Sequence, residues 1–139
     1  MRFSRGPDPF AIGLLLLVGA CEPSRIGLDA LPSGTWGGDD GGLIVTPEGA
    51  HAHIGCTLGD VAGPIPLNGE GRFDVEGRWN VDAFPVDRGI LHAARLSGWT
   101  DGRTLSLAVR LSDTGQSLGP VILTRGKEPR MQNCPICRR

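Results

Sequence analysis

The sequence predicts an all-β fold, a small antiparallel barrel or sandwich of about seven to eight strands, preceded by a signal peptide and a short tether. Three observations predict it. Residues 72–81 alternate between apolar and polar side chains, which is the period of a strand with one buried face. The 22 glycines and 11 prolines gather in clusters that divide the chain into strand-length pieces. After the leader, no stretch sustains the apolar period of a helix.

The first 20 residues have the order of a signal peptide. Arg2 and Arg5 precede an apolar run from Phe10 to Ala20, and a polar, turn-prone segment follows. A transmembrane helix needs about 20 consecutive apolar residues, and this run is shorter. We therefore expect a leader that is removed rather than a permanent span.

The end of this leader, Val18-Gly19-Ala20-Cys21, resembles the lipobox of bacterial lipoproteins. The resemblance implies cleavage before Cys21 and acylation of Cys21, which would anchor the chain to a membrane of the cell envelope, facing the periplasm or the cell exterior. Two or three acyl chains suffice for stable anchoring. Asp8 and the valine three places before the cysteine depart from the usual pattern. The alternative is an ordinary secreted protein in which Cys21 joins a disulfide.

Beyond Cys21, the chain divides into a tether (21–33), an antiparallel β domain (34–125) and a polar tail (126–139). Residues 37–42 contain four glycines and two aspartates and predict a loop. Residues 43–46 and 50–58 predict a hairpin with a three-residue loop at Pro47-Glu48-Gly49, and residues 59–64 predict a turn-rich connection.

The second half of the domain predicts three further strands after 72–81. Residues 90–100 and 103–111 flank Asp101-Gly102, a strong signal for a two-residue hairpin loop. That pairing would place Leu96 opposite Leu107 and His92 opposite Leu111. Residues 117–125 form the last predicted strand, with Pro120 at an edge or a bulge.

Gly34-Thr35-Trp36 at the first strand and Arg125 at the end of the last strand are similar to the pattern of lipocalin-type barrels. The resemblance implies a closed antiparallel meander, often around a small apolar ligand, in which the tryptophan packs beneath the basic side chain. The alternative is that Trp36 is simply a core aromatic.

If Cys21 carries lipid, Cys56, Cys134 and Cys137 remain, an odd number in an oxidising compartment. A bridge between Cys56 and Cys134 would tie the tail to the domain. Cys134 and Cys137 also form a C-x-x-C pair, which leaves open a thiol-redox site with Cys56. A metal site could use His51, His53, Cys134 and Cys137.

His51 and His53 share one strand face, and His92 is expected on the apolar face beside Leu111. The 14 basic and 15 acidic residues provide no field for nucleic acid. The sequence shows no catalytic residues, and it implies no cofactor. It predicts an anchored binding module for a small apolar ligand or an envelope protein; a metal-binding or thiol-redox protein is the alternative, and a hydrolase comes third.

Overall fold

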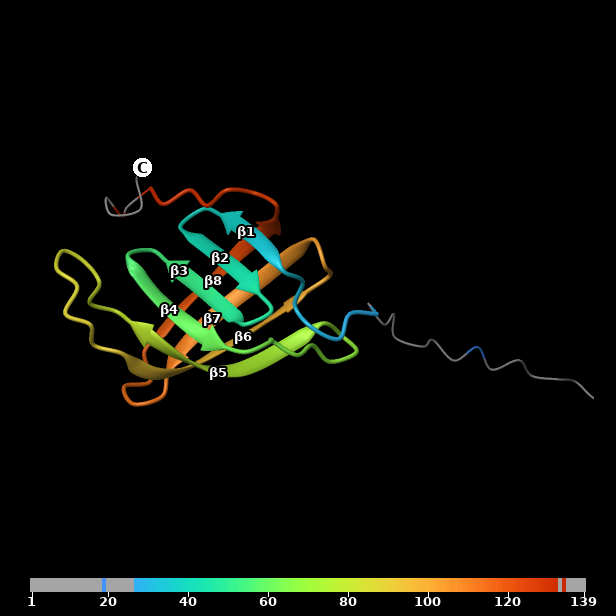
Figure 1. Ribbon diagram of the computed structural model, residues 1–139, viewed down its shortest axis with the longest axis horizontal. Coiled ribbons are helices and arrows are strands. Elements are labelled where there is room, and N and C mark those ends of the chain that lie inside the picture. Colours follow the sequence, from blue (N-terminus) through green and yellow to red (C-terminus); the bar gives the residue numbers. More distant parts are fainter. Residues whose placement is uncertain (1–18, 20–26, 133, 135–139) are drawn as a thin grey trace, which may run out of the picture.

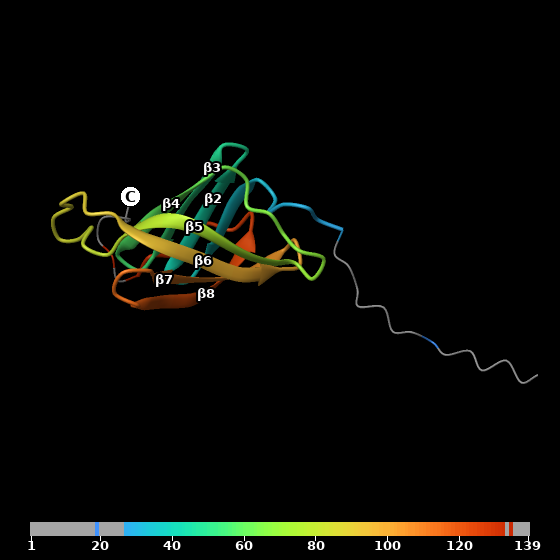
Figure 2. The same cartoon turned by 90° about the horizontal axis from the view of Figure 1, so that it is seen from below.

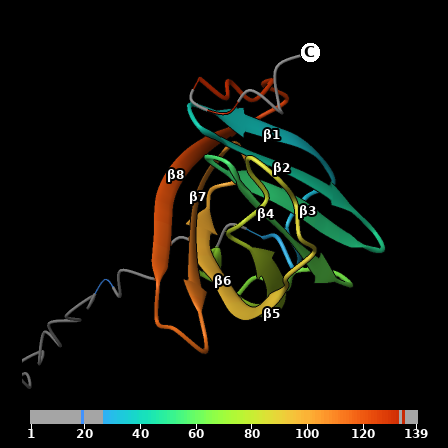
Figure 3. The same ribbon diagram turned by 90° about the vertical axis from the view of Figure 1, so that its left-hand side faces the viewer.

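Eight antiparallel strands close into a barrel in the computed structural model, which describes residues 19, 27–132 and 134. Each strand pairs with the next in chain order, and β1 pairs with β8 to close the ring (Figure 1 and Figure 3). The prediction of an all-β antiparallel fold is confirmed, and the closed ring decides between barrel and sandwich. The strands are β1 (Gly34–Gly38), β2 (Gly41–Thr46), β3 (Gly49–Ile54), β4 (Thr57–Ala62), β5 (Arg72–Asn80), β6 (His92–Thr100), β7 (Thr104–Leu111) and β8 (Ser117–Arg125).

Inward-facing apolar side chains fill the barrel. Alternation on β5 buries Phe73 and Trp79 while the charged residues between them stay outside, as predicted. Trp36 and Trp79 are fully buried, and they pack in one core with leucines from four other strands. The interior is therefore a packed core, as expected of a small barrel. The leucines exposed by no more than 1 % are Leu96, Leu105, Leu107, Leu111 and Leu123.

The prediction of a loop over 37–42 is wrong, because its glycines belong to β1 and β2 and only Asp39 and Asp40 form the turn. A side chain at Gly37 would collide with the backbone of residues 127–129, and one at Gly42 would collide with the Pro129 ring. These glycines are needed because the carboxyl-terminal segment lies directly against the two strands.

The predicted loop at 47–49 is one residue too long, because Thr46 pairs with Gly49 across a two-residue turn. The predicted connection at 59–64 is also wrong, since residues 57–62 form β4. Gly59, which suggested a turn, lies where the Trp79 ring and the Arg78 carbonyl leave no room for a side chain. Close packing between β4 and β5 explains this glycine.

The β6–β7 hairpin differs from its predicted register by two residues, with Leu96 opposite Val109 rather than Leu107. The Asp101 carboxylate accepts hydrogen bonds from the backbone N–H groups of Arg103 and Thr104, which lengthens the turn. Because the shift is even, the predicted faces are preserved. Opposite Pro120, the β7–β8 register shifts between Leu107 and Val109, which confirms the bulge.

Segments before and after the strands complete the domain. The Leu31 N–H donates to the Ile65 carbonyl (2.9 Å), and the Leu31 side chain is buried in the core. At the other end of the chain, Arg130 N–H donates to the Gly38 carbonyl (2.9 Å), which lays residues 126–132 across the β1–β2 turn. We call residues 126–132 the strap.

Candidate functional site

Three hydrogen-bonded side chains lie on the outer wall of β3 and β4. His51 Nδ1 is 2.7 Å from Asp60 Oδ1, and His51 Nε2 is 2.9 Å from His53 Nε2. His51 and His53 are two residues apart on β3 and therefore share its outward face, as the sequence predicted. The β3–β4 register places Asp60 directly opposite His51. We call these three residues the histidine cluster.

The hydrogen bonds of the cluster determine where its protons lie. The Asp60 carboxylate only accepts, so His51 Nδ1 carries the proton of that bond. In neutral His51 the other ring nitrogen is an acceptor, so His53 Nε2–H donates to it. Burial lowers the pKa of His53, the nearby His51 lowers it further, and Asp60 acts in the opposite direction. The balance favours neutral His53.

A groove of about 1100 Å³ adjoins the cluster on the outer wall of β4, β5 and β6. Asp60 contributes to both the cluster and the groove. Four charged side chains of alternating sign line the groove, and apolar and small side chains complete it. We call it the outer-wall groove; its lining includes Asp60, Glu76, Arg78, Leu91, Arg95 and Ser112.

Arg95 is held in the groove by two carboxylates. Its Nε donates to Asp74 Oδ1 at 2.8 Å, and its Nη1 lies 3.5 Å from Glu76 Oε1. The cross-strand register places Glu76 opposite Arg95 and Arg78 opposite Ala93. The groove therefore presents both signs of charge, with Arg95 held by its carboxylate partners, which suits a partner that carries both signs.

The long loop between β5 and β6 exposes four large apolar side chains, and the last of them, Leu91, lines the groove: Phe84 (42 %), Val86 (67 %), Ile90 (46 %) and Leu91 (49 %). A buried asparagine holds the loop, since Asn80 Nδ2 donates to Asp87 Oδ1 at 2.8 Å and Asn80 Oδ1 accepts from Asp82 N–H at 2.9 Å. Residues 81–91 are thus an anchored loop with an apolar surface.

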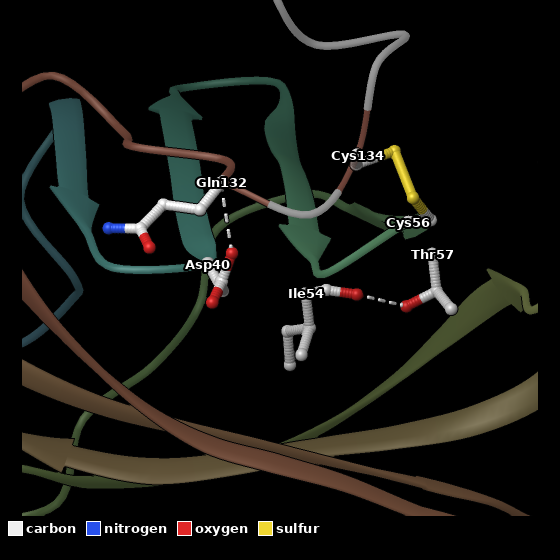
Figure 4. The surroundings of a disulfide bond; sticks show 6 residues. All are labelled: Asp40, Ile54, Cys56, Thr57, Gln132 and Cys134. Carbon is white, nitrogen blue, oxygen red and sulfur yellow. Dashed lines mark hydrogen bonds between the residues drawn. A yellow bond between two sulfur atoms is a disulfide. The ribbon is translucent and has the colours of Figure 1, made fainter.

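The two cysteines among the described residues are bonded to each other. Cys56, in the β3–β4 turn, and Cys134, beyond the strap, form a disulfide (Figure 4). The expected bridge between these two residues is therefore present, and Cys134 has no thiolate to offer a metal. Cys137 and the lipidation candidate Cys21 lie outside the described residues.

The two residues of the lipocalin-like pattern meet where the barrel closes. Trp36 on β1 is directly opposite Arg125 on β8. The indole Nε1–H donates to the Pro32 carbonyl (3.2 Å), and the guanidinium donates to the Ser33 carbonyl (3.2 Å). Both side chains thus fasten the segment that leads into β1.

His92 lies away from the other two histidines. It is opposite Trp79 on β5, and the predicted pairing with Leu111 is wrong because of the two-residue shift in the β6–β7 hairpin. Its Nδ1 lies 2.7 Å from Asp113 Oδ2, and this hydrogen bond lowers the pKa of the Asp113 carboxyl.

Sequence reasoning missed Asp60 and the groove. Asp60 was read as part of a turn because it stands between glycines and proline. The available signal was that Asp60 and Ala62, which are exposed, alternate along the chain with Gly59 and Val61, which are buried in the strand. The groove needs side chains from three strands, and no local pattern indicates it.

No protein-family model, curated protein or solved structure matches this chain significantly. In the part of the chain that the structure describes, no helix is long and apolar enough to cross a membrane.

Proposed function

We propose that this protein is a lipid-anchored module of the bacterial cell envelope that binds a protein partner through its outer wall. The observation that carries the proposal is the outer-wall groove, which is lined by charged side chains of both signs and by Leu91 of the apolar β5–β6 loop. A protein surface offers charge and apolar area together, which such a patch requires. The packed interior favours this partner over a small apolar ligand held inside the barrel.

The position of residues 27–31 relative to the β5–β6 loop supports an outward-facing site. Residues 27–31 and the β5–β6 loop lie at opposite ends of the barrel in two perpendicular views (Figure 1 and Figure 2). An anchor on Cys21 would hold the end of the barrel that carries residues 27–31 towards the membrane. The apolar loop would then project away from the lipid, where a partner can reach it.

Anchoring is tested by growing cells that express the protein with an alkyne-labelled fatty acid. We expect label in the wild-type protein, none in Cys21→Ala, and full label in Cys137→Ser. Label that persists in Cys21→Ala, or fails to reach the wild-type protein, contradicts anchoring.

Partner binding is tested by photo-crosslinking in intact cells from one position at a time. Ala93 lines the groove and Val86 is exposed on the loop, whereas Ile122 is 57 % exposed on β8, across the barrel (Figure 3). We expect the same defined adduct from Ala93 and Val86 and none from Ile122. Arg95→Glu should abolish that adduct. Adducts of equal yield at all three positions, or none at Ala93 and Val86, contradict the proposal.

A further inference from the structure

The two histidines of the cluster aim the same ring nitrogen at each other. The Nε2 atoms are 2.9 Å apart, and the ring planes cross at 76°. His51 is partly exposed, with 42 % of its side chain accessible to solvent. Two imidazole nitrogens at this separation on a strand surface are within the span of one metal ion.

We propose that His51 Nε2 and His53 Nε2 bind a divalent transition-metal ion, copper(II) in preference to zinc, with Asp60 as the positioning residue for His51. The inference does not depend on the proposed function, because it requires neither anchoring nor a partner in the groove. It also differs from the site expected from sequence, since no cysteine takes part.

The identity of the ligands decides the preferred ion. Imidazole nitrogens suit copper, zinc and nickel, and at such sites copper(II) binds most tightly of the common divalent ions. The 2.9 Å between the two Nε2 atoms is the length of their hydrogen bond, so it shows that the two ligand atoms are neighbours and does not select a coordination geometry.

Asp60 prepares His51 for this role. Its carboxylate accepts the Nδ1 proton at 2.7 Å, which leaves the Nε2 lone pair of His51 available. A carboxylate behind a ligating histidine is the common arrangement at protein metal sites, where it orients the ring and raises its basicity. His53 binds once its Nε2 proton moves to Nδ1, so both rings remain neutral and no proton need leave the site.

The surroundings set the number of ligands. Within residues 27–132 and 134, no group of three or more histidine, cysteine, aspartate or glutamate side chains is placed to hold a metal. Among the described residues, His51 and His53 are the ligands proposed, and water would complete the coordination.

Copper binding is tested by titrating metal-free protein carrying Cys21→Ser and Cys137→Ser, so that neither thiol binds or reduces the ion. Calorimetry gives the stoichiometry, and electron paramagnetic resonance shows the coupling of copper to ligand nitrogens. We expect one copper per chain, a spectrum with two coupled imidazole nitrogens, and weaker binding of zinc.

Variants separate this site from general copper binding. His51→Ala and His53→Ala should each weaken binding at least tenfold, and Asp60→Asn should weaken it about 10–100-fold. His92→Ala is the matched control, because His92 has the same kind of carboxylate partner and 2.7 Å contact but belongs to no histidine pair. Unchanged affinity in His51→Ala or His53→Ala, an equal loss in His92→Ala, or tighter binding of zinc would overturn the proposal. Circular dichroism checks that each variant is folded.

Discussion

Cys56 and Cys134, 78 positions apart in the sequence, form a disulfide with their Cα atoms 5.1 Å apart. The bridge joins the β3–β4 turn to Cys134, just beyond the strap, and at the end of the strap Asp40 accepts a hydrogen bond from Gln132 N–H at 3.1 Å (Figure 4). Closing so long a loop reduces the freedom of the unfolded chain.

Cys134→Ser should therefore lower the free energy of unfolding by about 4 kcal/mol, on the chain-entropy account of disulfides. Urea unfolding followed by tryptophan fluorescence measures this. Cys137→Ser is the control and should leave the midpoint of the urea unfolding transition unchanged. A Cys137→Ser variant that loses as much as Cys134→Ser would contradict the pairing.

Trp36 should be far more important for stability than Trp99. Trp36 is fully buried, and its indole donates a hydrogen bond to the Pro32 carbonyl; Trp99 is 40 % exposed on β6. We expect Trp36→Ala to lower the free energy of unfolding by about 3–5 kcal/mol. Trp99→Ala should lower the free energy of unfolding by clearly less, when both variants are unfolded in denaturant under the same conditions. Equal losses would contradict the placement of Trp36 in the core.

Asn80 should control the β5–β6 loop. Its amide bonds to Asp87 and Asp82 while only 2 % of the residue is exposed. Asn80→Ala should lower the free energy of unfolding by about 1–3 kcal/mol, because the residue's buried hydrogen bonds are lost. Hydrogen exchange should accelerate in residues 81–91. Arg88→Ala, an exposed change in the same loop, should leave exchange as it is; slow exchange retained in Asn80→Ala would show that the loop is held elsewhere.

The sequence predicted the fold class and the strand faces because both are local. Alternation over 72–81 identified β5 and its buried face. In the β6–β7 hairpin the predicted faces also hold, because the register shift of two residues is even. Registers were less predictable, since side chains such as Asp101 lengthen a turn by bonding to its backbone. Closure of the barrel depends on β1 meeting β8, a contact between distant segments that no local pattern encodes.

In the candidate sites, too, local features were predictable and contacts between strands were not. The shared face of His51 and His53 follows from their spacing. Their contact with Asp60 requires β4, a strand whose glycines led to the prediction of a turn. The glycines of residues 37–42 led to the prediction of a loop, because the distant contact that requires them is not visible in the local sequence. They make room for the strap, and the strap lies about 90 residues further along the chain.

The acid sensitivity of the protein should come in part from His53. Burial and the neighbouring His51 hold the pKa of His53 below its ordinary value, with Asp60 opposing them. A depressed histidine pKa means that the unfolded chain binds the proton more readily than the folded one. The stability that neutral His53 contributes is therefore complete above about pH 6.5, where an unperturbed histidine titrates, and is lost as the pH falls through its folded pKa.

Nuclear magnetic resonance titration of the imidazole protons tests this residue by residue. His51→Gln should raise the pKa of His53, because the electrostatic effect of His51 lowers that pKa, and Asp60→Asn should lower it, because the effect of Asp60 raises it. His92→Gln is the control and should leave the His53 titration as it is, since His92 bonds to Asp113 rather than to the cluster. A His53 that titrates at or above about pH 6.5 in the wild-type protein would contradict the buried, hydrogen-bonded arrangement of the cluster.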